Sequence, residues 1–271
     1  MGLVLNYGDR VLLLTERGNR YLVTLKRGER LHSEDGVVSH DSLIGLEHGD
    51  VVESSTGVRA AVLYPTVYEL LASMPRRTQI VYPKDLGMIA FLADARPGSR
   101  IVEGGTGSGV LALYLATRVS PGGLVVSYDL SDERFPVIER TAERLGVRQA
   151  LALRKGDLAE PEERDVDAFV ADVPEPWGVV GGAVKALRGG GTFVAIVPSV
   201  NQLERTVSAM RASGIVDYFV GELMIRPWRV RVGATRPVHV TRGHTVFIAS
   251  GRKVNAGDVS SWNLKLPLGF R

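Results

Sequence analysis

The sequence predicts an α/β protein, in which a Rossmann-like, mainly parallel sheet with helices on both faces follows a small N-terminal β-domain. Three observations predict this fold. Short extended runs separated by turn residues occupy the first 62 residues, strand and helix patterns alternate from residue 83 onward, and a glycine-rich turn follows the first strand of the alternating part.

The N-terminal part contains the patterns of several short strands. Extended runs occur at 9–15, 20–26, 50–54 and 59–63, with a polar turn at 33–36. A helical pattern then covers 65–74, and Pro75 ends it directly before Arg76 and Arg77. We therefore expect a small β-barrel-like domain over 1–64 and a linker containing a helix over 65–82.

The larger part, 83–254, is expected to form the α/β domain. Strands are predicted at 100–103, 124–128, 150–154, 168–172 and 192–197, and helices at 84–95, 110–119, 133–145, 179–187 and 202–212. Two further extended runs, 218–232 and 244–250, have no helix between them and are predicted to add an antiparallel hairpin to the sheet edge. The tail over 255–271 shows no clear pattern.

Composition excludes several classes of protein. Hydrophobic residues make up 45% and charged residues 23% of the chain, which is enough for a globular core. No apolar run approaches the roughly 20 residues that span a bilayer, and the first residues lack a signal-peptide pattern, so we expect a cytoplasmic protein. The chain has no cysteine, which excludes disulfides, iron–sulfur clusters and cysteine nucleophiles. Its five histidines lack metal-ligand spacing, and no metal is expected.

The glycine-rich turn suggests a ligand at the end of the first strand of the sheet. It consists of Glu103, Gly104, Gly105, Thr106, Gly107, Ser108 and Gly109. Small residues let the backbone come close to a ligand, and Asp129 at the end of the next strand can accept hydrogen bonds from both hydroxyls of a ribose. Together they indicate an adenosine-containing cofactor.

Two cofactor classes fit a turn of this kind. The stretch beginning at Gly107 also matches a loose dinucleotide pattern, but it would start four residues after Glu103, where the strand is expected to end. The run from Glu103 instead has the ExGxGxG form typical of class I methyltransferases, which use S-adenosylmethionine. Gly105, Gly107 and Gly109 would then line the methionine end. Gly156 and Asp157, after the third strand, are predicted to contact the cofactor adenine.

A proline-rich motif follows the fourth strand. It reads Asp172, Val173, Pro174, Glu175, Pro176, Trp177. Two ring-fixed backbones make a rigid platform, which suits a pocket for a flat base taken out of its stack, although a simple strand-to-helix turn with a core Trp177 would look the same. Asp172 is the candidate catalytic residue of this motif, because its carboxylate can stabilise the positive charge that a base gains during methyl transfer.

Arginines concentrate near the end of the α/β part. Arg226, Arg229, Arg231 and Arg236 surround Trp228 in the predicted terminal hairpin. Guanidinium groups and an exposed aromatic ring suit phosphates and unstacked bases, while a merely charged solvent face is the alternative. Arg76 and Arg77 in the linker are further candidate RNA contacts.

Five separated motifs resemble those of tRNA (adenine-N1)-methyltransferases acting at T-loop position 58. They are Tyr82-Pro83-Lys84-Asp85, the 103–109 turn, Ser127-Tyr128-Asp129, the 172–177 motif and Gly243-His244-Thr245. Their order is that of the family, and the resemblance covers about residues 5 to 250. It implies a tRNA partner, S-adenosylmethionine as cofactor, a homotetramer, and a target that can include the adjacent adenine 57.

The resemblance also implies roles for individual residues. Gln79, Ile80, Val81 and Tyr82 would cover the cofactor and target base, Asp129 and Arg134 would hold the ribose, and Asp157 the adenine. Tyr82 would be a catalytic residue together with Asp172, and Trp177 and His244 would contact the RNA. Two departures are visible: Gly104 stands where an alanine is usual, which we expect to be harmless, and Asp129 replaces a glutamate.

Two other hypotheses remain open. The chain could be a class I methyltransferase for a protein or small molecule, which would not need the proline-rich motif or the arginine cluster. It could also be a non-catalytic tRNA-binding subunit, but such a subunit is expected to lose the glycine turn or the acidic positions, and both are present here. A nicotinamide dehydrogenase is the least favoured class.

Overall fold

The computed structural model describes residues 4–74, 81–240 and 243–262. The chain divides into two compact units, Met1–Pro75 and Arg76–Arg271. The division falls inside the 65–82 segment that the sequence predicts to be a linker, while the detailed domain bounds stay predictions.

The N-terminal unit is built from short antiparallel strands. Strands β1 (Arg10–Thr15), β2 (Arg20–Thr24), β5 (Val51–Glu53) and β6 (Arg59–Leu63) form a sheet in the order β2-β1-β6-β5. Around the predicted polar turn, β3 (Arg30–Ser33) and β4 (Gly36–Ser39) form a hairpin that the sequence did not predict. The unit also contains the 3-10 turn η1 (His40–Leu43) and the short helix α1 (Val67–Ala72). Leu5, Val11, Leu13 and Leu25 are buried in its core.

The second unit contains a seven-stranded sheet. In chain order its strands are β7 (Arg100–Gly104), β8 (Leu124–Asp129), β9 (Leu151–Lys155), β10 (Val166–Ala171), β11 (Leu187–Val197), β12 (Ile215–Gly221) and β15 (Phe247–Lys253). Their spatial order is β12-β15-β11-β10-β7-β8-β9. Neighbours from β9 to β11 run parallel, and β15 is antiparallel to both β11 and β12.

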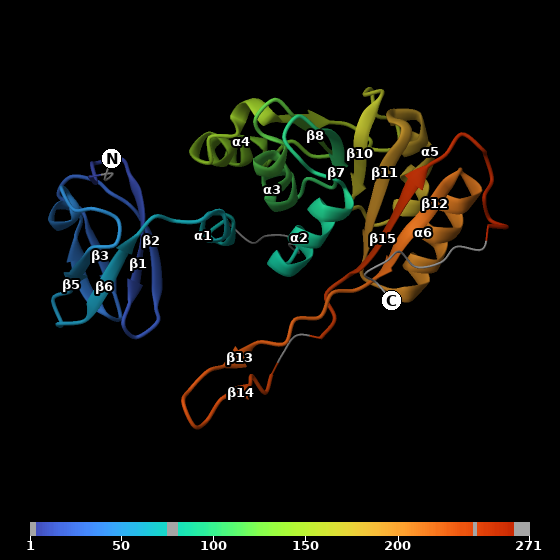
Figure 1. Ribbon diagram of the computed structural model, residues 1–271. Helices are drawn as coiled ribbons and strands as arrows, with labels where there is room; N and C mark the ends of the chain where they lie inside the picture. The colour runs from blue at the N-terminus through green and yellow to red at the C-terminus, as the bar shows by residue number, and fades with distance from the viewer. Residues whose placement is uncertain (1–3, 75–80, 241–242, 263–271) are drawn as a thin grey trace. The chain divides into compact units, whose positions relative to one another are not determined.

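Helices cover both faces of this sheet (Figure 1). They are α2 (Pro83–Leu92), α3 (Val110–Val119), α4 (Phe135–Arg144), α5 (Pro176–Ala186) and α6 (Val200–Ala212), with a 3-10 turn η2 (Arg148–Ala150) before β9. A sheet covered on both faces needs apolar side chains on both, and the successive residues Phe169 and Val170 of β10, which point to opposite faces, are both fully buried. No helix among the described residues is long and apolar enough to cross a membrane.

The order of the central strands determines where a ligand can bind. After β7 the chain forms β8 and β9 on one side of that strand. It then crosses to β10, which lies on the other side of β7. In open α/β sheets the crevice at such a switch point, outside the carboxyl ends of the strands, is the usual ligand site. The glycine turn after β7 and the proline-rich motif after β10 both lie at this edge.

The predicted terminal hairpin is only partly correct. Strands β12 and β15 do pair antiparallel, but the extended run expected over 218–232 ends at Gly221. Beyond it, β13 (Trp228–Arg229) and β14 (Arg236–Pro237) pair with each other as a separate two-stranded ribbon. Pro227 has no N–H to extend a ladder, and Gly233 turns the chain at a φ of 77°. The arginines therefore lie on this ribbon and not on the sheet edge.

Candidate cofactor and substrate site

The glycine turn is held against the end of β8 by its own backbone. The amides of Gly105 and Thr106 both donate to the carbonyl oxygen of Tyr128, at 3.0 and 3.3 Å. Gly105 has a φ of 83°, and a Cβ on it would lie 1.8 Å from the carbonyl oxygen of Asp172. A Cβ on Gly109, at a φ of 81°, would lie 2.6 Å from Ile138. Both positive φ values favour glycine, and at Gly105 the close approach of another backbone segment requires it.

A pocket of about 440 Å³ opens beside this turn. Its wall comes from the ends of four neighbouring strands and from α5, and consists of Gly105, Tyr128, Asp129, Leu130, Gly156, Asp157, Leu158, Val173, Pro174, Glu175 and Val179. The wall combines apolar side chains with three carboxylates, which is the usual make-up of a small-molecule site.

Asp129 and Asp157, for which the sequence predicts cofactor contacts, both line this pocket. The carboxylate of Asp129 accepts from the amides of Gly107 and Ser131, each at 2.9 Å, so its orientation is defined by the backbone on both sides. Asp157 accepts from the amide of Ala159 at 2.9 Å and is otherwise exposed. Each carboxylate keeps lone pairs for hydroxyl or amine donors of a ligand.

Glu103 lies beneath the glycine turn in a chain of buried polar groups. The hydroxyl of Ser127 donates to Glu103 Oε2, and the hydroxyl of Thr106 lies 2.6 Å from that of Ser127. Glu103 Oε1 is buried and has no hydrogen-bond partner among the residues that the structure describes. Burial raises the pKa of Glu103 to about 8, which Ser127 opposes and the nearby Asp172 and Asp129 reinforce. The free protein therefore holds this carboxyl protonated at neutral pH.

Asp172 follows β10 directly and faces the same turn. Its amide donates to the carbonyl oxygen of Gly104 at 2.9 Å. Burial raises the pKa of its carboxyl to about 6, so the group is mostly ionised at neutral pH but is poorly solvated. Asp172 is partly buried, and a carboxylate with little solvation interacts strongly with a cation placed next to it.

The segment expected to cover the cofactor is described only in part. Val81 is buried, and Tyr82 precedes α2, where its carbonyl oxygen accepts from the amides of Asp85 and Leu86 at 2.8 and 3.0 Å. Arg134 directly precedes α4 and is half-buried. Arg76, Arg77, Gln79 and Ile80 lie outside the described residues, so their assigned contacts stay predictions.

Trp177 belongs to a different surface. It lies in the first turn of α5, and the guanidinium of Arg205 on α6 stands 3.9 Å from the centre of its ring. A second pocket of about 490 Å³ is lined by these two residues and by Glu204, Ser208, Ala209 and Ala212. Because Pro176 already begins the helix, Trp177 packs toward α6 and is not among the residues that line the pocket beside Asp129. Its predicted contact with RNA remains a prediction.

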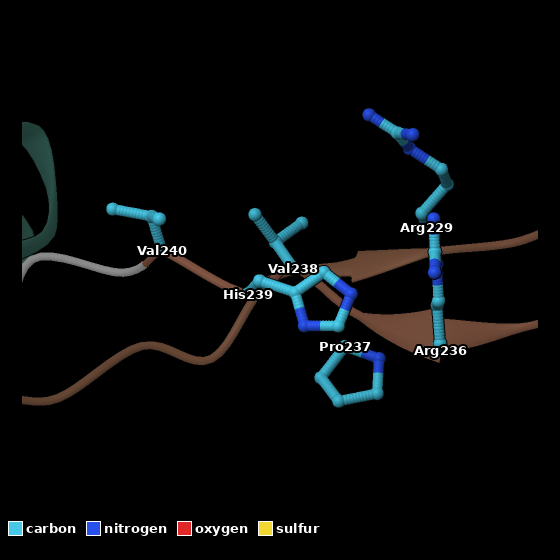
Figure 2. Close-up of a pocket in the computed structure, with 6 residues that line it drawn as sticks. All are labelled: Arg229, Arg236, Pro237, Val238, His239 and Val240. Atoms are coloured by element: carbon cyan, nitrogen blue, oxygen red, sulfur yellow. The ribbon is translucent and has the colours of Figure 1, made fainter.

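The arginine cluster occupies the β13–β14 ribbon. Arg229 and Arg236 pair directly across the two strands, and they line a hollow of about 240 Å³ with Pro237, Val238, His239 and Val240 (Figure 2). Arg226 lies 5.7 Å from the centre of the Trp228 ring. Arg231 lies outside the strands, in the turn, where its carbonyl oxygen accepts from Ala234 and Thr235. All four arginines are exposed.

His244 lies outside the ribbon. Its Nδ1 is 2.7 Å from Glu222 Oε2, and its Nε2 is 3.1 Å from the carbonyl oxygen of Pro198. The hydrogen bond to Glu222, followed by that to Pro198, raises the pKa of His244. Both partners are acceptors, so protonated imidazole satisfies both.

Sequence reasoning missed the apolar wall of the pocket. Tyr128, Leu130, Leu158 and Val179 line it without having been singled out. Tyr128, Leu130 and Leu158 are each adjacent in sequence to a predicted site residue, and this adjacency could have identified them. Val179 comes from α5, and only the packing of that helix brings it to the pocket.

The residues present fit S-adenosylmethionine. The anionic Asp172 suits a ligand with an ammonium and a sulfonium, the unpartnered Oε1 of Glu103 can accept one hydrogen bond, and Asp129 suits a ribose. A side chain at Gly105 would clash with the backbone of Asp172 and disrupt the turn. The sheet order, with its antiparallel β15, and these acids at the strand ends define a class I, S-adenosylmethionine-dependent methyltransferase.

The chain belongs to the family described as the tRNA methyltransferase complex GCD14 subunit, whose profile matches residues 60–245. A TrmI-like N-terminal profile matches residues 4–52. The chain is 35% identical over 248 residues to the tRNA (adenine(58)-N(1))-methyltransferase TrmI of Thermus thermophilus, covering 91% of this chain and 97% of that protein. It is 31% identical to the tRNA (adenine(57)-N(1)/adenine(58)-N(1))-methyltransferase TrmI of Methanocaldococcus jannaschii, covering 89% and 94%.

Two solved structures have the same overall fold. An S-adenosylmethionine-dependent O-methyltransferase from Thermotoga maritima superposes with a TM-score of 0.89 at 32% identity, covering 93% of this chain and 95% of that one. The tRNA (m1A58) methyltransferase TrmI from Aquifex aeolicus superposes with a TM-score of 0.82 at 24% identity, covering 93% and 100%.

Proposed function

We propose that this enzyme transfers a methyl group from S-adenosylmethionine to N1 of adenine in the T-loop of tRNA, at position 58 and also at the adjacent position 57. The observation that carries the proposal is the partly buried Asp172, held beside the glycine turn, together with the absence of cysteine from the chain and a family match that covers most of it. The 57/58 activity named for the Methanocaldococcus relative supports the second position.

Bound S-adenosylmethionine supplies an electrophilic methyl group on a sulfonium. In this proposal Asp129 holds the ribose hydroxyls, Asp157 and the apolar wall around Leu130 hold the adenine, and the turn around Gly105 cradles the methionine end. The partly buried Asp172 accepts from the amine of the target adenine and stabilises the positive charge that the base acquires. Tyr82 lies next to α2 and packs against the target base.

The RNA is proposed to contact the β13–β14 ribbon. Arg229 and Arg236 stand directly opposite each other, an arrangement in which like charges repel unless an anion lies between them. A phosphate suits this pair, and the exposed Trp228 beside Arg226 offers a face for an unstacked base. Arg76, Arg77, Arg231, Trp177 and His244 are proposed as outer contacts.

We also propose a homo-oligomer, a homotetramer by resemblance to the family, acting in the cytoplasm where its tRNA substrate is found. The ribbon and its flanks support the assembly, since Val230 is 80% and Val240 89% exposed. Apolar side chains gathered on one exposed segment are typical of a contact surface.

The decisive experiment incubates the protein with methyl-labelled S-adenosylmethionine and unmodified tRNA transcript, followed by nucleoside analysis. We expect 1-methyladenosine, with primer extension stopping at 58 and at 57. Transcripts with guanosine at 57, at 58 or at both assign each signal. A different methylated nucleoside, or none, would overturn the proposal.

The second candidate is methylation of a hydroxyl on a small molecule, which the likeness to the Thermotoga O-methyltransferase favours. That reaction needs a base to remove the hydroxyl proton, whereas adenine N1 does not. Label transfer to a phenolic acceptor but not to tRNA would support this candidate.

A further inference from the structure

Two motifs far apart in the sequence meet in one buried polar cluster. The ammonium of Lys84 donates to Asp85 Oδ1 at 2.7 Å, to the carbonyl oxygen of Leu223 at 2.7 Å, and to the hydroxyl of Thr245. That hydroxyl in turn donates to Asp85 Oδ2 at 2.8 Å. Three acceptors thus match the three N–H donors of one lysine.

The cluster is enclosed. The side chain of Asp85 is fully buried and that of Lys84 is 11% exposed, while Thr245 as a residue is 8% exposed. A buried ion pair is costly to desolvate, so it stabilises a fold only when its geometry and hydrogen bonds are complete. Here they are complete among the described residues, which makes the cluster a rigid connection with one defined geometry.

Its position connects two parts of the proposed site. Leu223 comes two residues after β12 ends, and Thr245 comes two residues before β15 begins, so both ends of the excursion that carries the arginine ribbon meet at Lys84. Lys84 and Asp85 form the first turn of α2, directly after Tyr82, whose carbonyl oxygen accepts from the Asp85 amide at 2.8 Å.

We propose that Lys84, Asp85 and Thr245 are positioning residues for the tRNA: they fix the base of the arginine-bearing excursion to the first turn of α2, next to Tyr82. RNA held on the ribbon is thereby presented in one register relative to the pocket. His244 and Glu222 bond to each other where the same segment leaves and re-enters the sheet. His244 also bonds to the carbonyl oxygen of Pro198, which follows β11. This inference rests on the proposed function, because it assumes that RNA binds the ribbon.

The test uses variants that remove the connection without leaving a buried charge alone. Thr245→Val is nearly isosteric and removes the hydroxyl. Lys84→Met combined with Asp85→Leu removes both charges together, because loss of one partner would strand the other. Thr245→Ser keeps the hydroxyl and is the conservative rescue. The matched control, Arg211→Met with Asp217→Leu, removes another ion pair of the same unit, which joins α6 to β12 at 2.6 and 2.8 Å.

Four quantities separate positioning from mere folding: the melting temperature, the Kd for S-adenosylmethionine, and KM and kcat for tRNA. We expect Thr245→Val and the Lys84/Asp85 double variant to keep the cofactor Kd within about twofold while KM for tRNA rises about tenfold. Thr245→Ser should restore the wild-type KM, and the Arg211/Asp217 control should leave it unchanged.

Several outcomes would overturn the inference. Folded variants with an unchanged KM for tRNA would do so, and so would a parallel loss of cofactor and tRNA binding that follows the melting temperature. Failure of both variants to fold would assign the cluster to folding alone. Wild-type protein that does not methylate tRNA in the same assay would instead refute the proposed function, and the inference with it.

Discussion

The carbonyl oxygen of Asp172 occupies the space in which a side chain on Gly105 would begin. A Cβ at Gly105 would lie 1.8 Å from that oxygen and 2.7 Å from the carbonyl carbon. The turn after β7 and the end of β10 therefore pack backbone against backbone. This contact holds the backbone of Asp172, the candidate catalytic residue, directly against the glycine turn.

Replacing Gly105 should accordingly damage both the site and the fold. We expect Gly105→Ala to lose about 3 kcal/mol or more of unfolding free energy, because a positive φ and a clash with backbone add together. Gly181→Ala is the control, since it lies within α5 with no atom within 4 Å of an added Cβ. It should be neutral or stabilising by up to about 1 kcal/mol. Urea unfolding of both variants measures this, and a Gly105→Ala protein as stable as wild type would contradict the packing.

Position 104 tolerates a larger side chain less well than we expect from the sequence. A Cβ there would lie 2.4 and 2.6 Å from the two methyl carbons of Leu158, which is buried in the pocket wall. We expect Gly104→Ala to destabilise the protein by about 1 to 3 kcal/mol through overpacking. Combining it with Leu158→Ala should recover part of that loss. A double-mutant cycle with no coupling between the two positions would show that the leucine moves aside freely.

Between about pH 4.5 and 8, Glu103 and Asp172 should make the free protein less stable as the pH rises. The folded state holds Glu103 at a pKa of about 8, far above the ordinary value of 4.5, so it binds a proton that the unfolded chain releases. The stabilisation is complete below about pH 4.5 and is lost progressively up to about pH 8, amounting to several kcal/mol. Asp172, with a pKa of about 6, contributes in the same direction over a lower range.

The Glu103→Gln variant tests the contribution of Glu103 separately from that of Asp172. Its unfolding free energy should vary much less between about pH 6 and 8 than that of wild type, since glutamine does not titrate. Denaturant unfolding at a series of pH values measures this. Equal slopes for the two proteins would mean that Glu103 is ionised in the native state.

Asp172 should matter for turnover more than for cofactor binding. We expect Asp172→Ala to keep cofactor affinity within roughly tenfold and to lower turnover by about two orders of magnitude, a typical loss for one electrostatic contact. In the wild type, kcat/KM should fall as pH drops below about 6, where the carboxyl becomes protonated. Single-turnover methylation and calorimetric cofactor titration give the two numbers. Near-normal turnover would remove Asp172 from its proposed role.

Arg229 and Arg236 should contribute to RNA affinity in a salt-dependent way. Arg229→Gln or Arg236→Gln should weaken tRNA binding and reduce the slope of log affinity against log salt by about one each. Arg140→Gln, on the exposed face of α4, is the control. Filter binding at several salt concentrations measures the slopes. Salt-dependence slopes equal to that of the Arg140→Gln control would exclude phosphate contacts by Arg229 and Arg236.

Much of the α/β domain could be predicted because its signals are local. The helix over Val110–Val119 has the predicted bounds, and the other predicted helices and central strands are shifted at their ends by a few residues at most, except that β11 begins at Leu187, five residues early. Apolar periodicity and breaker residues act within one element. The β3–β4 hairpin was missed because its strands are four residues long and largely polar.

The sequence by itself determined the glycine turn, the acids at the strand ends, the absence of thiol chemistry and the order of motifs that leads to the family. These depend on residue type and on spacing along the chain. Only the tertiary structure decided that Trp177 packs under Arg205, that the arginines leave the sheet for a separate ribbon, and that Lys84, Asp85 and Thr245 meet. Such contacts depend on how elements distant in sequence pack, and Asp85 and Thr245 are 160 positions apart.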